Sequence, residues 1–62
     1  MKTMGQKIKE RRSALGMTQA QLADLLGVTP RNISRYETDM TVPPRRALQT
    51  VAKVLGVSAE YL

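Results

Sequence analysis

The chain has 62 residues, the size of one small domain, and 42% of them are hydrophobic. Ten Lys and Arg against five Asp and Glu give a net charge of +5, which favours a polyanionic partner. Cysteine and histidine are both absent, which excludes disulfides, Cys/His metal sites, thiol nucleophiles and imidazole acid–base catalysis.

The first helix is predicted by a capping box near the start of the chain. Thr3 and Gln6 have the spacing at which a hydroxyl and an amide each bond to the other residue's backbone N–H. We expect the helix to begin at Met4 and to end before Gly16, because glycine readily takes the left-handed conformation at a helix C-terminus. Its expected apolar face consists of Met4, Ile8 and Leu15.

The same two signals predict a second helix. Thr18 and Gln21 form another capping box, and Gly27 is the expected stop of a helix over residues 19–26. Three leucines with helical spacing give it an apolar face, formed by Leu22, Leu25 and Leu26.

Proline marks the start of a third helix. Thr29 is a favourable N-cap, and Pro30 follows at the first helical position, where the missing N–H costs nothing. This helix is expected to be short and to end near Glu37.

Beyond a loop over residues 38–43, two more helices are expected. Pro44 can open a fourth helix that stops at Gly56, and Ser58 can cap a last turn at the C-terminal end. The fourth helix is expected to bury Leu48, Val51, Ala52 and Leu55, and the last turn contains Tyr61 and Leu62. The predicted architecture is therefore an all-α bundle of five short helices.

Residues 19–37 have the spacing of a helix-turn-helix. Only two residues separate the glycine that ends the second helix from Pro30, so the second and third helices must cross at a steep angle. Such a crossing needs a small residue where the backbones approach, and Ala23 is placed for it. Ile33 and Tyr36, three residues apart, are expected to point back at the crossing.

Two arginines occupy the opposite face of the third helix. Arg31 and Arg35 are four residues apart and lie away from Ile33, so they are expected to project together. A helix fits a major groove about 12 Å wide, and an arginine there can donate two hydrogen bonds to guanine O6 and N7. A pair of arginines is often only a solvated surface, but the adjacent turn and apolar face favour base reading. The other candidate base-reading residues, at the start of this helix, are Thr29, Pro30 and Asn32.

Phosphate contacts are expected at two other helix starts. The free N–H groups at the start of the second helix suit a phosphate oxygen, and capping by Thr18 leaves the Gln19 amide free to donate. Arg45 and Arg46 begin the fourth helix, where they either bind phosphates of the DNA backbone or are simply solvent-exposed charges.

A partly buried ion pair is predicted between the first and third helices. Glu37 is four residues from Ile33, which places its carboxylate at the margin of the core, where it needs a partner. Arg12 is four residues from Ile8 on the core side of the first helix and is the best candidate, with Arg11 as the alternative. We therefore predict an Arg12–Glu37 pair.

Three fragments together resemble the helix-turn-helix domain of lambdoid phage repressors and Cro proteins, the Xre-like group. They are MTQAQLADLLGV, TPRNISRYE and VAKVLGVSAEYL, and the resemblance covers nearly the whole chain. It implies a five-helix bundle that binds two-fold symmetric operator DNA as a dimer. By resemblance, a phosphate is held by Gln19, base-reading positions are occupied by Pro30, Arg31 and Arg35, and Asn32 contacts a base or a phosphate.

The sequence departs from this family at two positions. Asp39 stands two residues after Glu37, where the family commonly has glycine, and its carboxylate is expected to repel a nearby phosphate. Pro30 stands where relatives often have a polar side chain, so only an apolar contact with a thymine methyl is expected there.

The leading hypothesis is a single domain, residues 1–62, that binds operator DNA for a transcriptional regulator, most often a repressor in this group. No cofactor or metal is expected, and the absence of a signal sequence or apolar span indicates the cytoplasm. The alternative is an antitoxin-like module of the same fold that binds a partner protein. A hydrolase using Asp24 or Glu60 has no support, because neither carboxylate has an acid or base partner nearby in sequence.

Overall fold

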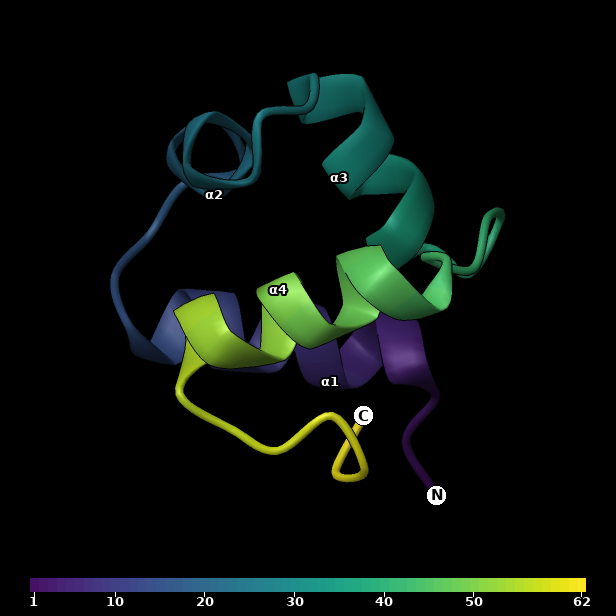
Figure 1. Cartoon of the computed structure of the whole chain (residues 1–62). Coiled ribbons are helices and arrows are strands. Elements are labelled where there is room, and N and C mark those ends of the chain that lie inside the picture. Colours follow the sequence, from purple (N-terminus) through teal and green to yellow (C-terminus); the bar gives the residue numbers. More distant parts are fainter.

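The computed structural model describes residues 1–62 and contains four α-helices and no strand (Figure 1). The helices are α1 (Met4–Ala14), α2 (Gln19–Leu26), α3 (Pro30–Glu37) and α4 (Arg45–Leu55). The predicted all-α class is confirmed, as are the expected starts and stops of these four helices. None of the four has the length and apolar composition needed to span a membrane.

The predicted fifth helix is wrong. Its residues form a single turn in which the Tyr61 N–H donates to both the carbonyl oxygen and the Oγ of Ser58, each at 3.1 Å. Five residues cannot offset the cost of nucleating a helix, so only the turn remains. Side chains of α1 hold this end of the chain: Lys7 Nζ donates to the Tyr61 carbonyl at 2.9 Å, and Arg11 Nε donates to the Leu55 carbonyl at 2.8 Å.

Threonine caps begin the first three helices, as the sequence indicates. Each hydroxyl accepts from the backbone N–H three residues on, at 3.0–3.2 Å, and both predicted capping boxes are complete. These caps are Thr3, Thr18 and Thr29. Because α2 ends at Gly27 with φ 69°, the chain can turn at once into α3.

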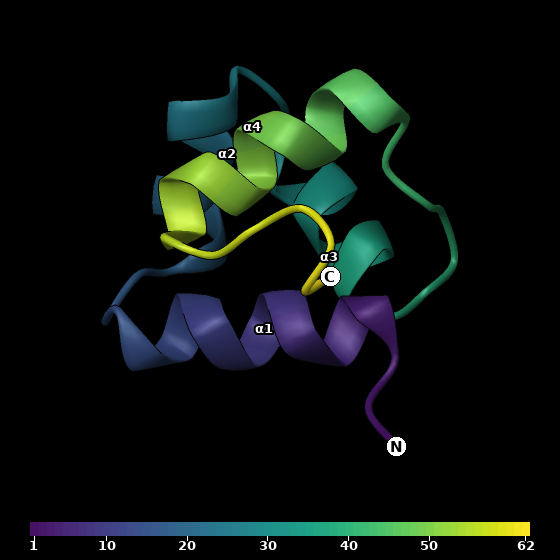
Figure 2. The same cartoon turned by 60° about the horizontal axis from the view of Figure 1, so that its bottom comes forward.

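All four helices contribute to one hydrophobic core. α2 packs against α3 and α4, and α1 packs against the same two helices. Figure 1 shows α2 and α3 above α4 and α1, and Figure 2 shows α1 along the lower edge of the turned molecule. The central buried side chains are those of Ile8, Leu22, Ala23, Ile33, Tyr36, Val51 and Leu55.

Two leucines predicted to be buried are exposed instead. Leu15 is 45% exposed and Leu25 is 60% exposed. Leu15 lies beyond the last helical residue of α1, at the C-cap. On α2, the core side is formed by Leu22, Ala23 and Leu26; Leu25 lies about 100° around the helix from Leu26 and so falls outside it. In α4, Val51, Ala52 and Leu55 are buried as expected, while Leu48 is only half-buried.

Candidate nucleic-acid interface

One side of α3 is buried and the other carries free arginines. Ile33 and Tyr36 are 0% and 6% exposed, so they fix the helix against the core. Arg31 and Arg35 are exposed, and neither takes part in an ion pair. Their guanidinium groups are therefore available to a partner outside the domain.

The start of α3 presents Thr29 and Pro30 beside the arginines. Both are exposed, but the Thr29 hydroxyl already accepts from the Asn32 N–H at 3.2 Å. Asn32 itself is half-buried, and its Nδ2 donates to Tyr36 Oη at 3.4 Å, toward the inner side of the helix. The structure thus leaves four of the predicted base-reading residues exposed on α3 or at its N-cap, and only Asn32 is half-buried; the exposed ones are Thr29, Pro30, Arg31 and Arg35.

A second group lies at the start of α2. The Thr18 hydroxyl accepts from the Gln21 N–H at 3.0 Å, and Gln21 Oε1 accepts from the Thr18 N–H at 2.8 Å, so both side chains are engaged in capping. Gln19 is half-buried, and its Nε2 donates to Glu37 Oε1 at 3.0 Å. One amide hydrogen of Gln19 is therefore committed to α3 and the other is free.

Glu37 is the centre of a buried network. Its Oε2 accepts from Arg12 Nε at 2.6 Å and its Oε1 from Arg12 Nη2 at 3.2 Å, with side-chain exposures of only 11% for Arg12 and 2% for Glu37. Arg12 Nη1 also donates to the Met17 carbonyl at 2.7 Å. The network joins α1, the turn after it, α2 and α3. The sequence offered no signal for the Gln19 and Met17 contacts, which depend on how the helices meet.

Asp39 has a role that the sequence did not indicate. Its carboxylate accepts hydrogen bonds from the Thr3 hydroxyl and from the Gly5 N–H, the latter at 2.9 Å. The carboxylate thus faces the N-terminus of α1.

Arg45 and Arg46 lie in the first turn of α4, and both are exposed and outside any ion pair. The residue at the N-cap is Pro44, and no side chain caps this helix. Two positive charges at the positive end of a helix dipole are unfavourable, and an external anion would offset that cost. The long loop between α3 and α4 leads to them along the outer edge of the molecule (Figure 2).

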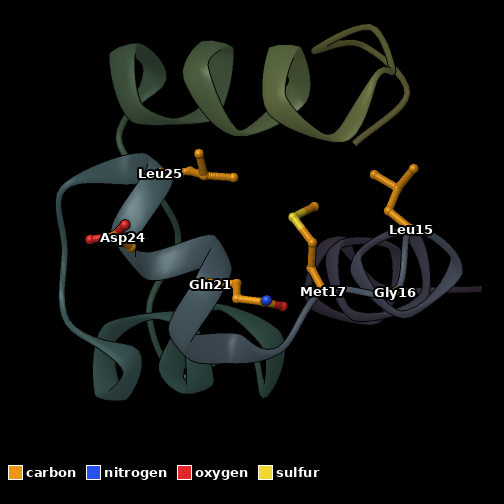
Figure 3. A pocket seen from close by; sticks show the side chains of 6 residues that line it. All are labelled: Leu15, Gly16, Met17, Gln21, Asp24 and Leu25. Carbon is orange, nitrogen blue, oxygen red and sulfur yellow. The ribbon is translucent and has the colours of Figure 1, made fainter.

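The structure also has an open groove of about 430 Å³ beside α2 (Figure 3). Its floor contains the exposed Leu15 and Leu25 together with Met17, and Asp24 is its one ionisable residue. A lone carboxylate without an acid or base partner gives no catalytic pair. Leu15 and Leu25, which were expected in the core, thus line this groove instead.

Comparison with known sequences identifies the family. A sequence model described as helix-turn-helix (HTH_3) matches residues 8–62. The chain is 33% identical over 58 residues to YonR, a prophage-derived uncharacterized HTH-type transcriptional regulator of Bacillus subtilis, covering 94% of this chain and 54% of that protein. It is 37% identical over 59 residues to repressor protein C2 of Salmonella phage P22, covering 95% of this chain and 27% of that protein. The chain thus spans about half, or less, of these relatives.

Solved structures agree with the sequence match. The P22 c2 repressor in complex with a synthetic operator superposes with a TM-score of 0.94 at 34% identity, covering 98% of this chain and 92% of that one. SinR, a master regulator for biofilm formation, in complex with DNA gives 0.84 at 32% identity, covering 94% of each chain. SinR in complex with the SinI protein gives 0.82 at 32% identity, covering 95% of this chain and 58% of that one.

The same fold also occurs within an enzyme. Hydroxypropylphosphonic acid epoxidase from S. wedmorenis matches with a TM-score of 0.83 at 33% identity, and the match covers 92% of this chain but only 30% of the epoxidase. The fold alone therefore does not define an activity. The matched family model, the relatives and the four-helix geometry together show that this chain belongs to the Xre-like, Cro/C1-type helix-turn-helix family.

Proposed function

We propose that this chain is the DNA-binding domain of a prokaryotic or phage transcriptional regulator, in a group whose members are most often repressors. In this proposal α3 enters the major groove. The observation that carries this is the division of α3 into a buried side with Ile33 and Tyr36 and an exposed side with the unpaired Arg31 and Arg35. Similarity to the P22 c2 repressor in complex with a synthetic operator, and to the regulator SinR in complex with DNA, supports the same function.

Base reading is assigned to the exposed side of α3. Arg31 and Arg35 donate to guanine O6 and N7, and Pro30 makes an apolar contact with a thymine methyl. Thr29 contributes beside them at the start of the helix. Asn32 is placed for a base or a phosphate only if it releases its long bond to Tyr36.

Backbone contacts are assigned to the starts of α2 and α4. The hydroxyl and the N–H of Thr18 are both engaged in the capping box, so Thr18 contributes by fixing the start of α2, and the phosphate oxygen is assigned to the free backbone N–H groups that follow it in the first turn. Gln19 has one amide hydrogen left after its bond to Glu37, and we assign that hydrogen to a phosphate oxygen. Arg45 and Arg46 neutralise phosphates beside α4.

Operator binding also implies how the domain assembles on DNA and where it acts. Two copies of the domain, residues 1–62, bind half-sites about 34 Å apart on a two-fold symmetric operator. Such a regulator acts in the cytoplasm, in contact with the nucleoid. It binds DNA without a cofactor or metal and is not itself an enzyme, and repression follows from occupancy of the operator.

The alternative function is an antitoxin-like protein-interaction module of the same fold. The observation that favours it is the open groove with exposed Leu15 and Leu25, since apolar surface of this kind suits a protein partner.

Salt dependence separates the two functions. The affinity for double-stranded DNA is expected to fall steeply with salt, with a log–log slope of about −0.9 for each phosphate contacted and at least about −2 per protomer from Arg45 and Arg46. The measurement is a fluorescence-anisotropy titration across several salt concentrations, after selection of bound sequences from a random duplex pool. Failure to enrich any sequence, with no salt-dependent duplex binding, contradicts the proposed function and favours the protein-interaction module.

Arg35→Ala is expected to relax specificity without abolishing binding. Loss of a bidentate contact to guanine should reduce discrimination at one base step by about 10-fold or more, while affinity for unrelated duplexes changes little. Because Arg35 is exposed and unpaired, the variant should stay folded.

The matched control for this experiment is Gln19→Ala, which should weaken binding to all duplexes to a similar extent. The measurement is competition between the selected operator and single-base variants of it. Equal losses on every sequence for Arg35→Ala would assign Arg35 to the phosphate backbone instead.

A further inference from the structure

α3 ends in the same hydrogen-bonding pattern as the other three helices, but with an aspartate instead of a glycine in the left-handed position. The Met40 N–H donates to the Arg35 carbonyl at 3.0 Å and the Asp39 N–H to the Tyr36 carbonyl at 3.2 Å, the bonding pattern of a Schellman motif. This motif needs a left-handed residue, and Asp39 supplies it with φ 62°. Glycine would have no steric penalty there, so what Asp39 adds at this position is its side chain. The other helices end with a left-handed glycine: Gly16, Gly27 and Gly56.

The Asp39 side chain serves as a cap for a different helix. The first turn of α1 contains no acidic residue, although a negative charge is favourable at that end of the helix dipole. The Asp39 carboxylate provides this charge by accepting from the Gly5 N–H and from the Thr3 hydroxyl. The Thr3 hydroxyl in turn accepts from the Gln6 N–H at 3.1 Å, so one carboxylate completes the whole cap of α1.

Close contact between α1 and α3 makes this arrangement possible. A Cβ at Gly5 would lie 2.5 Å from the Tyr36 carbonyl oxygen and 2.6 Å from that of Glu37. The N-terminus of α1 therefore lies directly against the C-terminal end of α3, as Figure 2 shows. Asp39 comes two residues after the end of α3, so this close packing brings its carboxylate within hydrogen-bond distance of the Gly5 N–H.

The loop that follows Asp39 has few other restraints. The Thr41 N–H donates to the Arg35 carbonyl at 3.3 Å, and neither Val42 nor Pro43 takes part in a backbone–backbone hydrogen bond. Pro43 is buried, and α4 begins at Arg45. At its α3 end the loop is held by the bonds of Met40 and Thr41 to the Arg35 carbonyl and by the Asp39 carboxylate, and before α4 it is held by the buried Pro43.

We propose that Asp39 is a positioning residue for DNA binding, an inference that rests on the proposed function. By fastening the loop after α3 to the N-terminus of α1, its carboxylate fixes where Arg45 and Arg46 stand relative to α3. Asp39 therefore strengthens DNA binding although its own charge is negative. If Asp39 merely repelled phosphates, as expected from its position in the sequence, its carboxylate would weaken DNA binding and its removal would strengthen it.

The test compares Asp39→Gly with Asp24→Asn, two variants that remove one negative charge each. Asp24 is exposed and forms no ion pair, so its removal should leave DNA binding unchanged or tighter. Asp39→Gly keeps a residue that tolerates the positive φ and deletes only the carboxylate. Its duplex binding is expected to weaken about five-fold at 0.1 M salt, with a salt slope smaller by about one, because a phosphate contact is lost.

Two further readouts separate positioning from simple stabilisation. In an Arg45→Ala/Arg46→Ala background, Asp39→Gly should change duplex affinity less than about two-fold, since the residues it positions are gone. In the free protein, hydrogen exchange of the Gly5 amide should accelerate about 10-fold or more in Asp39→Gly, while amides in the core of α4 should not change. Binding is measured at 10 °C, with folding verified by circular dichroism.

Tighter or unchanged duplex binding by Asp39→Gly, or an equal loss with and without the two arginines, overturns the positioning role. An unchanged exchange rate of the Gly5 amide in Asp39→Gly would show that the hydrogen bond from Gly5 to Asp39 is not formed in solution. If the unaltered chain fails to bind duplex DNA, the proposed function and the positioning role both fail, and the Gly5 exchange rate still reports independently on the contact.

Discussion

Glu37→Ala is expected to lower the free energy of unfolding by about 3–5 kcal/mol, the cost of leaving a buried charge without its partner. Arg12, with its side chain 11% exposed, would lose both of its bonds to the carboxylate, and Gln19 would lose its acceptor. A domain of this size has a total stability of only about 3–9 kcal/mol, so most of it would be removed. Urea denaturation followed by circular dichroism measures the loss.

The control for this variant is Glu10→Ala. Glu10 pairs with Lys2 and raises the pKa of its ammonium through a hydrogen bond, but both side chains are more than half exposed, at 56% and 52%. Removing one partner of such an exposed pair should leave the free energy of unfolding almost unchanged, because solvent screens the two charges. The double variant Arg12→Met/Glu37→Leu removes both buried charges and should recover much of the stability. A loss for Glu37→Ala no larger than that for Glu10→Ala would mean that the buried network is not closed in solution.

Gly5→Ala is expected to destabilise the protein by about 2–3 kcal/mol, or about 10–20 °C in Tm. The added methyl group would meet two backbone carbonyl oxygens at 2.5 and 2.6 Å, and backbone cannot rotate away as a side chain can. Helix α1 would have to move off α3, and the Gly5 bond to Asp39 would lengthen with it.

Alanine is a better helix former than glycine, so propensity alone predicts the opposite sign at this position. Ser13→Ala, at an exposed position of the same helix, is the matched control and should be neutral or slightly stabilising. Thermal unfolding of both variants measures the difference, and a Gly5→Ala variant as stable as Ser13→Ala would rule out the close contact between the helices.

The features that could be predicted from the sequence are those with a local cause. Threonine caps, Pro30 and Pro44 at helix starts, and glycine stops after three of the helices, each act within one helical turn, so they locate the four helices before any packing is known. The ion pair between Arg12 and Glu37 could also be inferred, since each residue lies one helical turn from a core isoleucine.

The features that could not be predicted depend on how helices meet. Nothing local connects Asp39 with Gly5, 34 residues away, and the close approach that excludes a side chain at Gly5 exists only in the packed molecule. Leucine spacing on α2 could not distinguish Leu25 from Leu22 and Leu26, because the position of the core side is set by α3 and α4. The fifth helix failed for a different reason, since a capping serine marks a turn equally well.

The separation of the two sides of α3 has a consequence for how such a domain diversifies. Residues that hold the helix in place face inward, whereas the guanidinium groups of Arg31 and Arg35 form no ion pair within the chain. Exchanging those outward side chains would therefore cost the fold little, typically within about 0.5 kcal/mol for a surface position. Under the proposed function, new operator preferences would be accessible by successive single substitutions on this side of α3, each of which is expected to leave the fold stable.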